Sequence, residues 1–283
     1  MLNIIKSDLY RILRGKAIYI AIIIMLAMAT FSIFGMSPGY IGTVTVDEKN
    51  EADQEISPET IEVMKQAEDT NSLTEMRKII KEHFYFELDK KIIGANSNLY
   101  YIFIVIVFVT ICVDLASSTA KNTLSSAISR KKYYLAKLIT ILILGTILTL
   151  INDYYIYFMN IIMNGKQFSS NFIDFTKCVL MQYPIIIGML GILVGLAFVT
   201  RKRSTFNTIS IALLIITQLI LMAIITLFRI DPVILKWELQ NILENLVQNP
   251  ANEYIIKTCI LGFTYFTGAN LIGYYSFKKA EIK

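Results

Sequence analysis

Charge is scarce in this sequence, and so are the residue patterns that usually carry catalysis. Charged residues make up 17% of the 283 residues, whereas they make up about 25% of an average soluble domain. Histidine and tryptophan occur once each. The sequence contains no Gly-x-x-x-x-Gly-Lys-Ser/Thr phosphate loop, no His-Glu-x-x-His pair and no Cys or His set with metal-ligand spacing. We therefore expect no catalytic residues, no metal site and no cofactor in this chain.

Hydrophobic residues make up 55% of the chain and gather in long runs with few charges. A run of about 20 apolar residues crosses the ~30 Å hydrocarbon layer as a helix. Because backbone amides in lipid must bond within their own segment, each run is predicted to be helical. The expected fold class is all-α, a polytopic membrane protein with six spans at 17–36, 99–115, 138–163, 176–199, 206–228 and 254–277.

The basic residues are distributed unevenly between the connections, which predicts the orientation of the chain. Fifteen lysines and arginines lie in the segments that are cytoplasmic if the N-terminus is inside: 1–16, 116–137, 200–205 and 278–283. Five lie near the short outer connections, 164–175 and 229–253. Since cytoplasmic loops are enriched in Lys and Arg, both termini are predicted inside. The net charge of +5 then reflects orientation and contact with anionic membrane lipid, not binding to nucleic acid.

Three segments outside the spans have patterns of their own. Residues 1–16 place apolar residues at helical spacing, which predicts an amphipathic helix at the cytoplasmic interface. Residues 37–98 carry thirteen acidic and seven basic side chains, with helix-start patterns at Ser57 and Ser72. We expect a small acidic, extracellular helical insertion there. Residues 229–253 predict a short amphipathic helix that either lies at the outer interface or re-enters the membrane.

The connection 116–137, between the second and third spans, is the most informative stretch. Residues at helical spacing predict a short helix with a small apolar face: Thr119, Lys121, Leu124, Ala127 and Ile128. The basic cluster at 130–132 would hold the start of the third span at the lipid headgroups. From the residues alone, a docking element for another protein and an ordinary positively charged loop are equally good interpretations.

This stretch resembles the first cytoplasmic loop of type-2 ABC exporter permeases. In that family the pattern acidic-x-acidic-x-Gly-Thr-x-Lys-Asn-x-Leu-x-Ser-x-x-Ser-Arg precedes a span that begins near a lysine. The matching positions are Asp114, Thr119, Lys121, Asn122, Leu124, Ser126, Ser129, Arg130 and Lys137. The sequence departs from the pattern at Ala116, where a second acid is usual, and at Ser118, where glycine is usual.

The resemblance implies a partner and a class of function. Residues 117–130 would form a coupling helix in a groove of a separate ABC ATPase subunit, which would bind the ATP and Mg. The implied contact residues are Thr119, Lys121, Asn122, Leu124, Ala127, Ile128, Ser129 and Arg130. A second permease subunit would complete a homodimer or heterodimer. Bacterial membrane subunits that export peptide toxins, including phenol-soluble modulins, or protect against lantibiotics or bacitracin have this size and plan.

Polar and small residues inside the spans are further candidates. Asn152 and Asp153 lie well within the third span, where a polar pair either lines a substrate path or bonds to a neighbouring helix. Gly188, Gly191 and Gly195 in the fourth span allow close helix packing. The sequence leaves open whether the packing partner lies within the chain or in a second copy.

We therefore expect the membrane subunit of an ATP-driven ABC exporter in the bacterial cytoplasmic membrane. The expected cargo is an amphipathic peptide, an antibiotic or a lipid-like compound, because the spans offer few charges to replace the hydration of a small ion. Two other classes stay open. One is an ATP-independent channel or secondary transporter, and the other is a non-transporting sensor or immunity protein that captures a ligand with its acidic loop.

Overall fold

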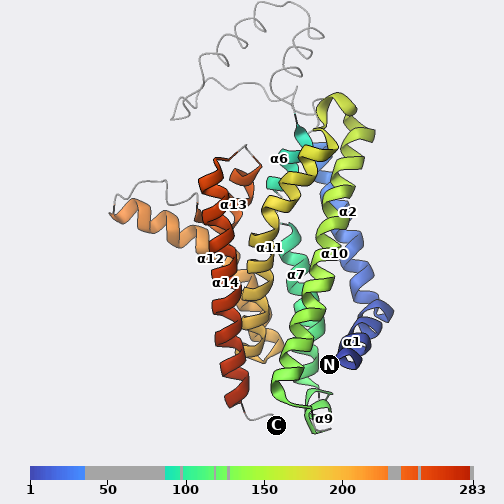
Figure 1. Ribbon diagram of the computed structural model, residues 1–283, viewed down its shortest axis with the longest axis vertical. Helices are drawn as coiled ribbons and strands as arrows, with labels where there is room; N and C mark the ends of the chain where they lie inside the picture. The colour runs from blue at the N-terminus through green and yellow to red at the C-terminus, as the bar shows by residue number, and fades with distance from the viewer. Residues whose placement is uncertain are drawn as a thin grey trace, which may run out of the picture.

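The computed structural model describes residues 1–35, 87–95, 98–117, 119–125, 128–228, 237–247 and 250–280. Every regular element within those ranges is a helix, which confirms the all-α class for that part of the chain. The long helices run side by side along the axis of an elongated bundle (Figure 1). The helix starts predicted at Ser57 and Ser72 lie outside the described residues.

Five helical segments are long and apolar enough to cross a membrane. They are Lys16–Gly35 (α2), Leu99–Ala116, Arg130–Asn164 (α10), Phe172–Thr200 (α11) and Asn252–Lys279 (α14). The second of them comprises α7 (Asn98–Val107), a π-helical turn η1 (Phe108–Cys112) and α8 (Val113–Ala116). These five segments coincide with five of the predicted spans, so the hydrophobic runs predicted the positions of these helices correctly.

The remaining predicted span, 206–228, coincides with α12 (Arg203–Phe228). It is a helix but is not one of the five candidates, so six spans stay a prediction. The C-terminal part of α12 projects from the side of the bundle (Figure 1).

The third span begins earlier than the sequence predicted. Residues 130–137 belong to α10, whereas the loop was expected to continue to residue 137. Ser129 accounts for the earlier start, because its side chain caps the helix by accepting a hydrogen bond from the Lys132 backbone N–H at 3.3 Å. Tyr133, Tyr134 and Ala136 are all buried in the bundle, which stabilises this added turn.

The tightest helix pair is α11 with α14, and small residues make it possible. A Cβ atom added at Gly188 would lie 2.9 Å from the carbonyl oxygen of Gly262, and one at Gly195 would meet the backbone of Ala269. A Cβ at Gly191 would likewise meet α14. The structure therefore places all three predicted packing glycines against a helix of the same chain, which the sequence had left open.

Two short helices, α6 (Leu88–Gly94) and α13 (Leu239–Leu246), pack on each other toward the end of the bundle that lies away from the N-terminus (Figure 1). A Cβ on Gly94 would lie 2.6 Å from the Val247 side chain. The buried carboxylate of Asp89 accepts hydrogen bonds from the Ser170 backbone N–H, at 3.0 Å, and from its hydroxyl, at 2.6 Å. Helix α13 is the amphipathic helix expected in 229–253, and it packs against α6 and α11.

Candidate functional site

Four charged side chains meet at one end of the bundle, where α1 (Leu2–Arg14), α9 (Thr119–Ser125) and the C-terminal end of α14 lie (Figure 1). We call this the termini end. Lys137 of α10 donates to Asp8 of α1 at 2.8 Å and to Asp114 of α8. Arg11 of α1 donates to the other oxygen of Asp114. We call Asp8, Arg11, Asp114 and Lys137 the ion cluster, and it ties α1 to two spans.

The amphipathic pattern of α1 explains why Asp8 faces inward. Ile5, Asp8 and Ile12 recur at helical spacing, and all three are buried in the described structure. The two isoleucines pack one face of α1 onto the bundle, and this packing carries the single acid between them to Lys137. Lys137 and Asp114 lie at the ends of apolar spans, so their charged groups meet where the spans reach α1.

Three of the four side chains of the ion cluster, Asp8, Asp114 and Lys137, are buried, so their charges depend on one another. Lys137 is 1% exposed and Asp114 is 2% exposed, while Arg11 reaches the surface. Burial raises the pKa of Asp8 above its usual range, and attraction to Lys137 offsets part of that rise. Two acids and two bases give a formal charge of zero, which a buried group of this kind needs.

A polar cavity of about 270 Å³ connects the ion cluster to α9. Its walls come from α1, α8, α9 and α10, and they include Ser7, Thr119, Thr123 and Tyr133 beside the cluster. Among the described residues, the buried Asp8 Oδ2 and Tyr133 hydroxyl have no hydrogen-bond partner. A displacement of α9 would therefore act directly on the wall that holds the ion cluster.

Helix α9 presents two different faces. Ala120 is buried and Leu124 packs half-buried against the core, so the apolar side of the helix is used within the chain. Thr119, Lys121 and Asn122 are exposed. A partner that meets α9 on this side would contact polar and basic groups, and the contact predicted for Leu124 stays a prediction.

The coupling helix expected over 117–130 is shorter than predicted. Ser117 and Ser129 both have extended backbone conformations, so α9 is one short helix separate from α10. Ile128 packs half-buried against the core, and Ala127 lies outside the described residues. The expectation of a single continuous helix was wrong because Ser129 starts a new helix there as its N-cap.

Arg130 has an intramolecular role that the sequence did not predict. Its guanidinium donates to the backbone carbonyls of Lys278 at 2.5 Å and of Ala280 at 2.8 Å, and also to that of Phe277. The last carbonyls of a helix have no partner within the helix, and a basic side chain satisfies them. Arg130 therefore joins the start of α10 to the end of α14.

The comparisons with known proteins identify the family. The family described as "ABC-2 family transporter protein" matches residues 2–256, which is nearly the whole chain. The chain belongs to the ABC-2 transporter family. A search of curated proteins found no match to it. ABC-2 permeases are membrane components of ABC transporters and generally work with an ABC ATPase subunit.

A second polar site of this ABC-2 protein lies inside α10. Asn152 and Asp153 are both buried, and the Asn152 amide donates to Asp153 Oδ1 at 3.0 Å. Their other oxygens, Asn152 Oδ1 and Asp153 Oδ2, have no partner among the described residues. Polar groups left unpaired at this depth lower stability, and such groups mark functional positions more often than packing positions.

The sequence pattern indicates Asp114 and Lys137 only as motif positions and does not identify Asp8 as a site residue. A signal for Asp8 was present, because it is the single acid of a basic amphipathic helix and lies on the apolar face of that helix. The pairing itself was not readable, since Asp8 and Lys137 are 129 residues apart in the chain.

Proposed function

We propose that this ABC-2 protein is the permease subunit of an ATP-driven exporter in the bacterial cytoplasmic membrane. The observation that carries the proposal is the polar cavity shared by α9 and the ion cluster. Through it, a force applied to α9 would reach α1, α8 and α10 together. In this proposal α9 docks on a separate ATPase subunit, and two permease subunits form the transporter.

The proposed mechanism uses the binding energy of ATP in the partner subunit. ATP and Mg bind there, and this chain contributes no catalytic residue. Closure of the ATPases moves α9, and the spans then change between inward-open and outward-open or collapsed arrangements. The shift requires that ATP bind one arrangement more tightly than the other, since a ligand moves an equilibrium only by its differential affinity.

The proposed cargo is amphipathic or apolar, such as a peptide, an antibiotic or a lipid-like compound. In the described parts of the spans, the acidic and basic groups of the ion cluster neutralise one another near one end. Asn152 and Asp153 would supply the polar groups of the path, with room for hydrogen bonds at their unpaired oxygens.

Charge reversal on the exposed face of α9 tests the ATPase contact. We expect Lys121→Glu to reduce co-purification of a Walker-motif ATPase from native membranes at least about ten-fold, since it places a carboxylate in a polar interface. Lys202→Glu, also exposed but in the connection between α11 and α12, is the control and should leave the yield unchanged. If wild type recovers no such ATPase, the exporter proposal is wrong and a channel or sensor is favoured.

Removal of the buried carboxyl in α10 tests the cargo path. We expect Asp153→Ala to assemble normally, because it removes a group with an unpaired buried oxygen, yet to transport cargo about ten-fold more slowly. Vesicle transport and thermal stability in detergent measure the two effects. Thr149→Ala is the matched control, since Thr149 lies one turn away and its hydroxyl already donates to the Gly145 carbonyl. Loss of assembly in Asp153→Ala would assign the pair a structural role.

A further inference from the structure

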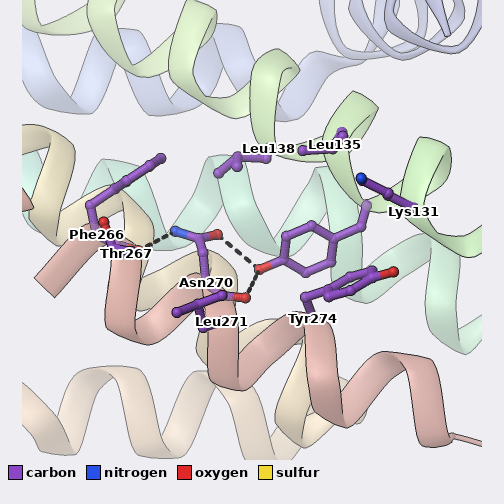
Figure 2. Close-up of a pocket in the computed structure, with 9 residues that line it drawn as sticks. Lys131, Leu135, Leu138, Phe266, Thr267, Asn270, Leu271 and Tyr274 are labelled. Atoms are coloured by element: carbon purple, nitrogen blue, oxygen red, sulfur yellow. Dashed lines mark hydrogen bonds between the residues drawn. The ribbon is translucent and has the colours of Figure 1, made fainter. Parts of the chain in front are cut away.

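A recess opens between α10 and α14, and its lining residues differ from those of the ion cluster (Figure 2). It has a volume of about 240 Å³. Leucine and aromatic side chains form most of its wall, with one lysine among the lining residues: Lys131, Tyr134, Leu138, Phe266, Leu271 and Tyr274. Both helices are candidate membrane spans, and the recess opens at the surface of the bundle, where Leu271 is exposed.

Two polar residues of the recess, Tyr134 and Asn270, are hydrogen-bonded within the protein. The Tyr134 hydroxyl donates to Asn270 Oδ1 at 2.8 Å, and the Asn270 amide donates to the Phe266 carbonyl at 2.7 Å. Figure 2 marks the hydrogen bonds of the Asn270 side chain as dashed lines. Because Tyr134 and Asn270 are already bonded within the protein and most of the remaining lining is apolar, an occupant gains its contact energy mainly from dispersion, which favours a hydrocarbon chain.

Lys131 distinguishes this recess from an ordinary groove on a lipid-facing surface. It lies in the first turn of α10, is exposed, and has no ion-pair or hydrogen-bond partner among the described residues. The guanidinium of its neighbour Arg130 is already hydrogen-bonded to carbonyls at the end of α14. Lys131 is thus a cation available at the level where the basic ends of the spans meet lipid headgroups.

We infer that the recess is a binding site for one anionic phospholipid, with an acyl chain against Leu138 and Leu271 and the phosphate paired with Lys131. Apolar contact alone does not select a lipid, because neighbouring lipid tails are as apolar as leucine. Selection comes from charge, since one lysine near an anionic headgroup gives a preference of about five-fold. The inference is independent of which cargo the protein moves.

The test is native mass spectrometry of the full chain, delipidated and then incubated with equimolar dioleoyl phosphatidylglycerol and dioleoyl phosphatidylcholine. Wild type should retain one phosphatidylglycerol in preference to phosphatidylcholine. Lys131→Gln should lower that preference about five-fold. Lys132→Gln, the adjacent exposed lysine that does not line the recess, should leave it unchanged. Equal losses in both variants would indicate a general basic surface and overturn the inference.

A second pair of variants tests the place of the acyl chain. Leu271 lines the recess and is 64% exposed, while its neighbour Ile272 is 67% exposed and does not line it. Leu271→Trp should fill the recess and reduce lipid retention at least about five-fold, whereas Ile272→Trp should not. Retention unchanged in Leu271→Trp would overturn the site. Two other results would also overturn it. If Leu271→Trp abolished self-association and wild type retained no lipid, this face would be a contact between two copies. If wild type retained free oleic acid as well as it retained phosphatidylglycerol, the site would not be specific for a phospholipid.

Discussion

Lys137→Ala is expected to destabilise the protein by about 3–5 kcal/mol, the cost of removing one partner from a buried ion pair. Lys137 is 1% exposed and is the only residue of the ion cluster that bonds to both acids while being fully buried itself. Without its ammonium group, Asp8 and Asp114 would face each other in the bundle with Arg11 alone to balance them. We expect α1 to detach from the spans and transport to be lost.

Thermal unfolding in detergent and the yield of monodisperse protein measure this effect. Lys132→Ala is the control, because Lys132 is on the same helix and exposed, and it should change the unfolding free energy by less than about 0.5 kcal/mol. Adding Asp8→Asn to Lys137→Ala should recover much of the lost stability, because the remaining pair of Arg11 and Asp114 is then electrically neutral. Wild-type stability in Lys137→Ala alone would show that the ion cluster does not hold α1.

Gly195→Leu is expected to separate α11 from α14 and to destabilise the bundle by about 3 kcal/mol, the upper part of the usual range for overpacking. Even a Cβ atom at this position would meet the backbone of Ala269, and Gly273 approaches Gly195 from the same side. Backbone cannot move aside as the end of a side chain can. The helices would have to part along the contact that Gly188 and Gly191 also form.

Gly268→Leu is the matched control for this substitution. Gly268 lies on α14, and a Cβ atom added there would have nothing within 4 Å. Leucine is a better helix former than glycine, so this variant should be neutral or more stable by up to about 1 kcal/mol. Protease resistance and unfolding temperature compare the two variants. Equal losses in both variants would show that the α11–α14 contact at Gly195 is not the cause of the loss.

The candidate site was only partly predictable from the sequence. The pattern around Thr119 and Lys121 located α9, because a short motif is local in the chain. It did not reveal that Leu124 packs inward or that Arg130 bonds to the end of α14, since both contacts join distant segments. The recess beside Lys131 was equally hidden, because it exists only where α10 and α14 lie together.

The sequence by itself determined that this protein is helical and built from membrane-spanning segments. Backbone groups in hydrocarbon must bond within their own helix, so the length and composition of each apolar run are sufficient to find it. The tertiary structure alone decided which helices touch and which charges are paired. Helix contacts in lipid depend on the fit of small residues, as at Gly195, and the pairing of Asp8 with Lys137 depends on how α1 lies across the spans. Neither the helix contacts nor the charge pairing can be predicted from a local sequence pattern, because each joins residues far apart in the chain.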